Sequence, residues 1–262
     1  MQRIIWWSIA IVGAAVFGLI IWNATRAPES QPVVQPAPRA EAPPPPAMPK
    51  MEEIRHPVPE VNLEKPLPAL DTSDSTMQGA IAGLSADQGL SGALILQGFV
   101  RRVVATVDNL PRSKVATRIL PLKRVEGAFA VSGNEGSYSI APANAARYAA
   151  YLKLMDAIAT DKLVAFYFHY YPLFQQAYRE LGYPKGHFND RLVEVIDHLL
   201  EAPELKPPVA LVRPKVLYLY ADPELEARSA GQKILMRMGA ENAARVKVKL
   251  KSIRAEIAGR KP

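Results

Sequence analysis

No cysteine occurs among the 262 residues. Disulfide bonds, cysteine nucleophiles and cysteine-ligated zinc are therefore excluded for this chain. The chain also lacks the glycine patterns of phosphate-binding loops and dinucleotide-binding folds. A nucleophile elbow, a serine three residues before a lysine and a paired-histidine zinc helix are missing too. These absences remove most of the enzyme classes that a short motif can reveal, and we expect no cofactor.

Charge is missing from one long stretch near the N-terminus. No charged residue lies between Ile4 and Trp22, a run of nineteen residues. A bilayer core about 30 Å thick needs roughly 20 helical residues, so this run has the length of one membrane span. The three tryptophans lie near its two ends, where amphipathic rings prefer the interface. We therefore expect residues 1–3 to be a short tail and residues 4–22 to be a transmembrane helix.

A cleaved signal peptide is the alternative interpretation of this run. Its apolar region would span about 7 to 15 residues and end at a small-x-small cleavage site. The run here is longer, and Trp22 stands where a small residue is needed before Ala24. The positive charges on the two sides of the run are nearly balanced, so they do not determine which end of the span lies in the cytoplasm. We expect the N-terminus to be cytoplasmic, because so short a tail before a first span commonly stays inside. We expect an uncleaved, single-pass inner-membrane anchor with a periplasmic domain.

Prolines dominate the segment after the expected span. Residues 27–50 contain nine prolines. Proline fixes φ and lacks a backbone donor, so this composition favours extended polyproline II over a packed core. We expect residues 23–65 to be a disordered, proline-rich tether. A proline-rich ligand for a small recognition domain is the alternative.

Residues 66–262 are long enough for a sizeable core, and helical patterns dominate them. We expect a mainly α, bundle-like domain. Ser73 or Asp74 can cap a first helix that ends near Leu84. Further helices are expected at 90–107, 143–159, 161–181 and 189–201, and from Asp222 onward with a break at Gly239.

Two other features interrupt the helical pattern. Residues 129–131 and 138–140 flank a glycine-containing turn and predict a small β-hairpin. Residues 209–220 are expected to be extended. Within the helix at 161–181, Pro172 should produce a kink or an interruption. The same helix carries an aromatic cluster between Tyr167 and Tyr178, which predicts core packing, with a ligand-stacking pocket as the alternative.

The best candidates for chemistry share the helix at 189–201. Asp190, Glu194 and Asp197 recur at i, i+4 and i+7, and His198 follows Glu194 by four residues. Carboxylates with an imidazole could act as acid and base, or Glu194 and His198 could ligate a divalent metal. The alternative is a solvated helix face on which Asp190 complements the helix dipole.

Positive charge is the second candidate for function. The net charge is +7, and the first 65 residues contain six basic and six acidic residues, so the excess belongs to the rest of the chain. Seven basic residues occur between 101 and 124, including Arg101 and Arg102, and seven occur between 245 and 261. Each segment contains a single acid. An anionic surface or an acidic protein fits this balance; nucleic acid is not expected, since no reading module is present.

The second basic segment predicts an amphipathic helix. Its apolar stripe, which includes Leu250 and Ile253, would dock on the domain. Lys247, Lys251 and Arg254 then recur on another face at i, i+4 and i+7. We expect these three side chains to face outward, either as a binding surface or as a solvated face.

Three blocks of the sequence follow one another in a characteristic order. They are RRVVATVDNLPR at 101–112, YPLFQQAY at 171–178 with GYP at 182–184 and FNDRLVEVIDHLL at 188–200, and PKVLY at 214–218 with ADPELE at 221–226 and SAGQK at 229–233. Together they resemble the signature of an uncharacterised bacterial family, DUF3014. The resemblance covers roughly residues 66–258 and implies a Gram-negative envelope protein with the same arrangement of anchor and tether. It implies no activity.

The leading hypothesis is a non-enzymatic envelope protein that binds a partner or an anionic surface through its basic helical domain. A metal-dependent or acid/base hydrolase acting on an envelope component is the first alternative, and it would use the candidates on the helix at 189–201. A structural subunit of a larger membrane complex is the second.

The expected topology can be tested with a reporter that is active only in the cytoplasm. Fused after Pro262, it is expected to be silent, because the domain would lie in the periplasm. Activity is measured in intact cells, against the same reporter fused to a cytoplasmic protein. Clear activity of the fusion would reverse the orientation.

Overall fold

The structure is a computed structural model that describes residues 53–63, 65–85 and 89–259. The predicted tail, the predicted transmembrane helix at 4–22 and most of the predicted tether lie outside these residues. Within the described ranges, no helix combines the length and the apolar character needed to cross a membrane.

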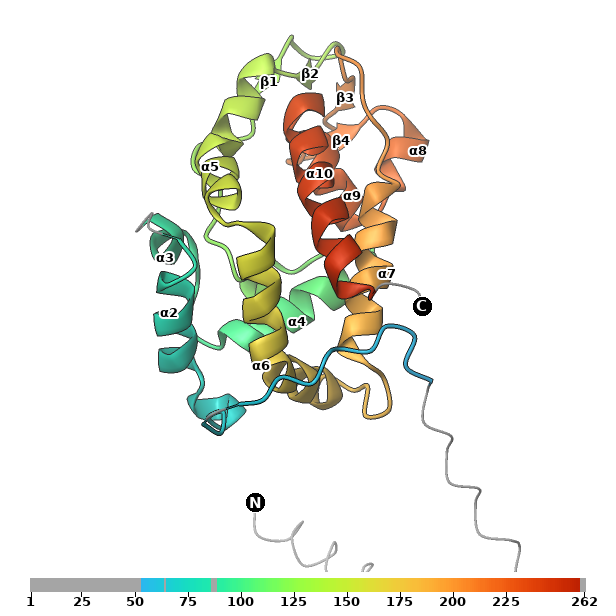
Figure 1. Cartoon of the computed structure of the whole chain (residues 1–262). Coiled ribbons are helices and arrows are strands. Elements are labelled where there is room, and N and C mark those ends of the chain that lie inside the picture. Colours follow the sequence, from blue (N-terminus) through green and yellow to red (C-terminus); the bar gives the residue numbers. More distant parts are fainter. Residues whose placement is uncertain (1–52, 64, 86–88, 260–262) are drawn as a thin grey trace, which may run out of the picture. The chain divides into compact units, whose positions relative to one another are not determined.

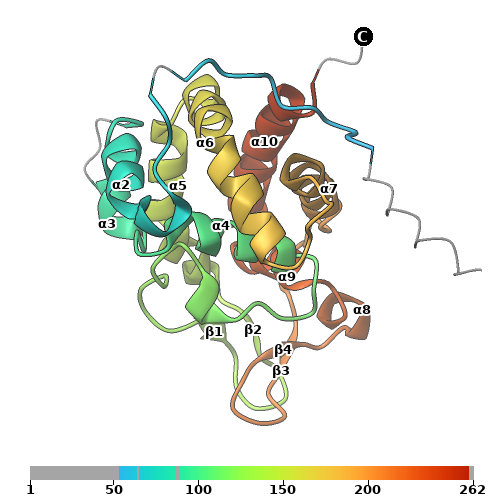
Figure 2. The same ribbon diagram turned by 90° about the horizontal axis from the view of Figure 1, so that it is seen from below.

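Four helices surround the centre of the domain. Helices α4 and α10 lie on opposite sides of α6 and α7, and each packs against both (Figure 1 and Figure 2). Their facing side chains, such as Val104, Phe174 and Val193, form the main cluster of buried apolar residues. The mainly α fold predicted from the sequence is therefore confirmed. The four are α4 (Phe99–Asn109), α6 (Thr160–Glu180), α7 (Phe188–Leu200) and α10 (Ala240–Ile257).

Shorter helices surround this central group, with η marking a 3₁₀ helix. They are η1 (Leu70–Thr72), α2 (Asp74–Ala82), α3 (Gly89–Ala93), η2 (Thr117–Ile119), η3 (Pro142–Tyr148), α5 (Ala149–Ala157), α8 (Pro223–Glu226) and α9 (Ala230–Arg237). The predicted break at Gly239 is confirmed, because this glycine adopts a φ of 89° between α9 and α10.

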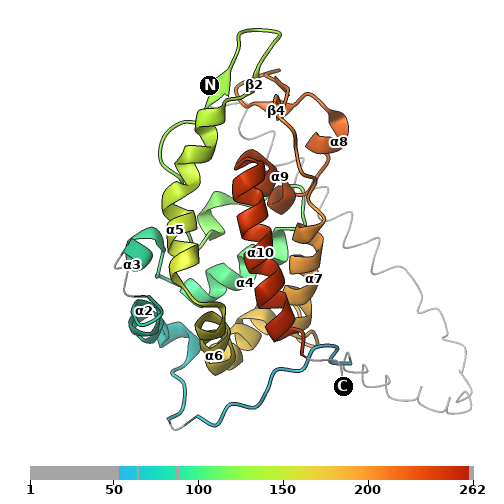
Figure 3. The ribbon, with the colours of Figure 1, turned by 45° about the horizontal axis from the view of Figure 1, so that its top comes forward.

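Two antiparallel hairpins lie next to each other at one end of the domain (Figure 1 and Figure 3). The first confirms the hairpin predicted near residues 129–140, and the second lies in the segment expected to be extended. A bridge between Ser139 and Ala210 joins them. The strands are β1 (Val131–Ser132), β2 (Ser139–Ile140), β3 (Leu211–Val212) and β4 (Leu219–Tyr220).

The single helix predicted from Leu90 to Val107 is wrong, because the chain forms α3 and α4 instead. Gly98 precedes α4 with a φ of 62°, a left-handed conformation that interrupts a helix and that glycine adopts without a steric penalty. Its N–H donates to the Asp74 carboxylate at 2.8 Å. Ser73, one of the two residues expected to cap α2, occupies the N-cap position, but its hydroxyl does not cap the helix and donates instead to the carbonyl of Leu70 at 2.8 Å.

Helix α6 continues through Pro172, so the predicted interruption does not occur. Proline removes one backbone hydrogen bond, and the ribbon bends along its length (Figure 1). Packing holds the helix together: the rings of Tyr167 and Phe174 lie 5.6 Å apart, and both are buried. Core packing of the aromatic cluster is therefore confirmed.

Residues 53–63 lie within the tether predicted at 23–65, but they contact the folded domain. They form an extended segment, here called the N-terminal strap, that passes the start of α7 and crosses the middle and later part of α6 (Figure 1). The backbone N–H groups of Arg55 and His56 donate to the Asp190 carboxylate at 3.1 and 2.7 Å. A ring nitrogen of His56 lies 2.9 Å from the carbonyl oxygen of Ala258. The strap is therefore part of the folded domain.

Glycine substitutions test the packing of α9 against α7. A Cβ at Gly231 would lie 2.5 Å from a methyl carbon of Leu199 and 3.1 Å from the carbonyl oxygen of Leu110. Gly231→Ala is therefore expected to lower the free energy of unfolding by about 1–3 kcal/mol. The matched control is Gly79→Ala in α2, where no atom lies within 4 Å of the new Cβ. It is expected to stabilise by about 0.5–1 kcal/mol. Denaturant unfolding measures both, and equal effects would contradict the packing.

Candidate functional site

The acidic candidates on α7 are all occupied by other parts of the chain: Asp190 and Glu194 face the strap, and Asp197 faces α10. Asp190 is only 7% exposed, and its carboxylate accepts the two N–H groups of the strap. Asp197 accepts both Nε and Nη2 of Arg254, the latter at 2.8 Å. Glu194 lies 2.9 Å from Arg191 and 4.0 Å from Arg55. The carboxylates therefore hold neighbouring elements in place.

His198 lies apart from these carboxylates. Its Nε2 is 2.8 Å from the hydroxyl of Ser229, the residue before α9, and its backbone carbonyl accepts the side-chain amide of Gln232 at 2.9 Å. The hydroxyl of Ser229 in turn accepts the N–H of Gln232 and caps α9. His198 thus joins α7 to the start of α9.

The structure brings only part of the predicted constellation together. Asp190 and Glu194 line a pocket of about 300 Å³ with Tyr178, His187, Glu53 and two arginines; Asp197 and His198 do not line it. Across the described ranges, no group of three or more histidine, aspartate or glutamate side chains could hold a metal ion. Glu194 and His198, the predicted metal pair, each contact another group.

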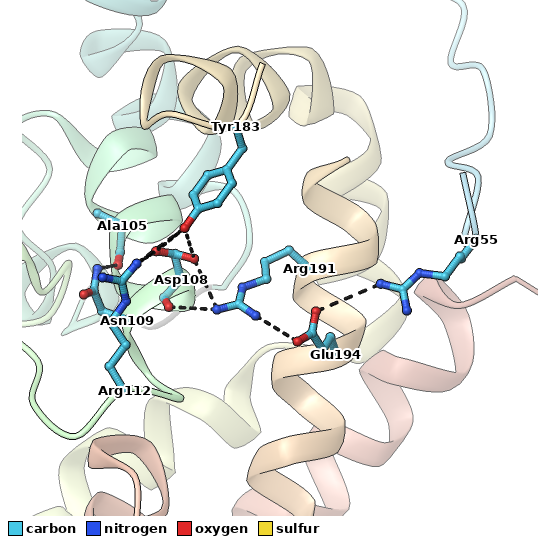
Figure 4. A network of polar contacts seen from close by, with 8 residues as sticks. All are labelled: Arg55, Ala105, Asp108, Asn109, Arg112, Tyr183, Arg191 and Glu194. Atoms are coloured by element: carbon cyan, nitrogen blue, oxygen red, sulfur yellow. Dashed lines mark hydrogen bonds and ion pairs between the residues drawn. The ribbon is translucent and has the colours of Figure 1, made fainter. Parts of the chain in front are cut away.

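A second polar network, which the sequence analysis missed, centres on Asp108 in α4 (Figure 4). Asp108 is 2% exposed. Its carboxylate accepts Nη2 of Arg112 at 2.6 Å and the hydroxyl of Tyr183 at 3.2 Å, and it lies 3.2 Å from Nη2 of Arg191. The charge of Asp108 is the main cause that raises the pKa of the Arg112 guanidinium. The buried charge is thus compensated by two cations and a hydroxyl.

The Asp108 network continues outward across α7. Arg191 donates to Glu194 at 2.9 Å, and Glu194 in turn faces Arg55 of the strap (Figure 4). Charges of alternating sign therefore connect α4, α7 and the strap. The sequence contained one signal for this network: an aspartate near the end of an amphipathic helix, with Arg112 four residues later.

The cations predicted on α10 do not form a free outward face. The side chain of Lys247 is 12% exposed, and its Nζ donates to the carbonyl of Ala202 at 2.6 Å, so the expected outward orientation is wrong for this residue. Arg254 is paired with Asp197. Lys251 is exposed. The predicted docking through Leu250 and Ile253 is confirmed, since both pack on the buried core.

The two arginines predicted at the start of the first basic segment also have partners. Arg101 lies 2.8 Å from Asp71 and 2.7 Å from Glu180. Arg102 donates through Nε to the carbonyl of Gln97 at 2.8 Å and through Nη1 to the carbonyl of Arg118 in η2. The two side chains therefore connect α4 to η1, to the end of α6 and to η2.

Cations gather instead in a depression between α5 and the loop before the first hairpin. This basic groove has a volume of about 460 Å³. Glu126 is the only acid that lines it. In the described part of the chain, Lys123, Arg124 and Arg147 have no acidic side chain within ion-pair distance. The residues that line it include Lys123, Arg124, Glu126, Arg147, Tyr151 and Lys153.

Arg147 is held rigidly at this groove. Its Nε donates to the carbonyl of Glu126 at 3.1 Å, Nη2 to that of Gly127 at 2.8 Å and Nη1 to the Asn144 amide oxygen at 2.8 Å. A guanidinium has five N–H donors, so two remain available. The sequence analysis missed this groove because Arg147 and Lys153 lie outside both basic segments and reach Lys123 only through the fold.

Comparisons with known proteins give one match. A family model described as "Protein of unknown function (DUF3014)" matches residues 99–254, which is more than half of the chain. No curated protein and no solved structure matches the chain. The matched residues include α4, α6, α7 and all but the last three residues of α10. They also include Lys123, Arg124, Arg147 and Lys153 of the basic groove.

Truncating Asp190 tests the attachment of the strap. Asp190→Ala is expected to lower the protection of the Arg55 and His56 amides against hydrogen exchange roughly tenfold or more. Each N–H loses its acceptor, which costs about 1–3 kcal/mol of the free energy that keeps the strap attached. The matched control is Glu201→Ala, an exposed carboxylate at the other end of the same helix, which should leave these amides protected. Hydrogen exchange with residue resolution measures both. Unchanged protection in Asp190→Ala would contradict the attachment.

Proposed function

The chain belongs to the DUF3014 family of proteins of unknown function, and from its own surface we propose that it is a membrane-anchored binding module that holds an acidic segment of another envelope protein in the basic groove. The observation that carries this proposal is the concentration of Lys123, Arg124 and Arg147 in one depression without acidic partners in the described part of the chain. Among the cations predicted as binding candidates, Arg101, Lys247 and Arg254 each lie near an acidic side chain.

The geometry of the groove favours an anionic ligand. Lys123, Arg124 and Arg147 converge there, and Glu126 is the one acid among the described residues that line the groove, so positive charge is in excess. A ligand with negative charge relieves the repulsion between these cations. Arg147 is already oriented by three bonds, so little conformational entropy is lost when its free donors bind a carboxylate. The hydroxyl of Tyr151 donates to the carbonyl of Lys123 at 3.0 Å and holds the other wall in place.

The shape of the groove favours a protein segment over a flat lipid surface. A depression of about 460 Å³ can enclose a few side chains. Anionic head groups, in contrast, present a broad layer of charge that fits a projecting basic surface better. We therefore favour an acidic protein segment, with an anionic membrane as the competing result of the test.

The membrane anchor in this proposal is inferred from the sequence alone, because residues 4–22 lie outside the described residues. Residues 4–22 have the length and composition of a membrane span. The proline-rich residues 27–50 would allow a reach of some 75 Å if fully stretched. An anchored module would meet membrane-bound partners at a high effective concentration, so modest affinity is enough.

The groove is tested by reversing its charge. The variant Lys123→Glu/Arg124→Glu/Lys153→Glu leaves Arg147 in place. It is expected to bind a hexaglutamate peptide at least tenfold more weakly than the native protein, because attraction becomes repulsion. Calorimetric titration at low and at physiological salt measures the affinity, which should weaken with salt in the native protein.

The matched control is Lys162→Glu/Lys185→Glu/Lys206→Glu, which changes the same charge at exposed positions outside the groove. It should keep most of the affinity. An equal loss in both variants would mean that only net charge matters and would contradict the groove. Preferential binding of phosphatidylglycerol vesicles over the peptide would assign the groove to lipid instead.

A further inference from the structure

The centre of the four-helix group contains a cavity that the packed side chains do not fill. This core cavity has a volume of about 330 Å³. Residues of α4, α6, α7 and α10 surround it, with Leu110 just beyond the end of α4 (Figure 1 and Figure 2 show the four helices). Packed protein interiors contain few voids larger than a water molecule. A cavity of this size is therefore a feature to be explained.

The walls of the core cavity are entirely apolar. No polar atom contributes to its surface, and the hydroxyl of Tyr167 is already bonded to Asn189 at 3.1 Å. Buried water needs two to four polar partners, so water is not a stable occupant. An engineered apolar cavity of about 150 Å³ stays dry and binds benzene. The core cavity has more than twice that volume.

The residues that line the cavity set its reach. On α7 they run from Phe188 to Leu199, and on α4 and just beyond its end from Phe99 to Leu110. Each of these stretches of eleven residue steps corresponds to about 16 Å at 1.5 Å per residue. An extended hydrocarbon chain can contact the lining over such a length, which a compact ring cannot.

The volume sets the length of that chain. A methylene group occupies roughly as much space as a water molecule in the liquid, about 30 Å³, so the cavity holds about eleven carbons. Several lining residues, including Val107, Leu163 and Ile253, are partly exposed. The cavity therefore reaches solvent, and a polar head group can stay outside while the chain lies within.

We propose that the core cavity is a binding site for a single unbranched acyl chain of about ten to twelve carbons. The apolar walls, the volume and the length of the lining along α4 and α7 together support this assignment. The site is separate from the basic groove, with which it shares no lining residue. The chain could come from a free fatty acid or from an acylated glycerol, which present the same hydrocarbon to the cavity.

A series of straight-chain carboxylates tests the proposal on the full chain. From hexanoate to tetradecanoate, below their micellar concentrations, each added methylene is expected to tighten binding about fourfold until roughly eleven carbons, and no further. Calorimetry measures the affinity and stoichiometry, and thermal unfolding should shift upward with dodecanoate. Monodecanoylglycerol distinguishes the sources: binding equal to decanoate indicates that an esterified chain is accepted, and weaker binding indicates a free acid.

Filling the cavity provides the decisive variant. Val107→Phe places a ring in the cavity and is expected to lower dodecanoate affinity at least tenfold while the protein without ligand unfolds at an equal or higher temperature. Val103→Phe, one turn away, is the second variant if the first does not fold. The matched control is Val248→Phe on the outer face of α10, where the side chain is 65% exposed; its affinity should not change.

Three results would overturn the proposal. The first is an absence of binding across the whole carboxylate series. The second is equal binding by Val107→Phe and the native protein, which would place the ligand elsewhere. The third is tighter binding of naphthalene than of decanoate, which would replace the unbranched chain with a flat ring.

Discussion

The side-chain amide of Asn189 is the interaction on which the arrangement of the central helices depends. It is 1% exposed. Its oxygen accepts the hydroxyl of Tyr167, and its nitrogen donates to the carbonyls of His56 and Ile257 at 2.8 and 2.9 Å. Burial raises the pKa of Tyr167 well above its ordinary value, so this hydroxyl remains a donor. One amide thus fixes α6, α7, the end of α10 and the strap, and a displaced segment would leave a costly unsatisfied group.

The positive charge of α10 has a related structural role. Arg254 binds Asp197 in the last turn of α7, and Lys247 donates to the carbonyl of Ala202 just beyond its end. Lys249 donates to the carbonyl of Ile158, next to α5. The alkyl stems of these side chains can cover apolar surface while their charged ends bind at the edge. These polar contacts hold α10 in place beside the core cavity. The position of the helix therefore does not depend on apolar side chains filling that cavity.

Much of the local structure could be predicted from the sequence, because periodicity is a property of each segment alone. The positions of α6, α7, the first hairpin and the break at Gly239 followed from apolar spacing and glycine. Gly98 was missed because it lies inside an otherwise periodic run. Partners far apart in the chain, such as Asp190 and His56, could not be inferred, since only the fold brings them together. Nor does an apolar pattern reveal whether the side chains fill the space that they enclose.

The strap has a mechanical consequence. A ring nitrogen of His56 is hydrogen-bonded to the carbonyl of Ala258, so the first and last residues of the described domain lie at the same end of it. Tension applied to the chain ahead of residue 53 first loads the Asp190 carboxylate and the start of α7. The hairpins β1–β2 and β3–β4 lie at the opposite end (Figure 1) and are outside the direct line of force. Such a domain would transmit a pull through α7 and the end of α10 while its basic groove keeps its shape.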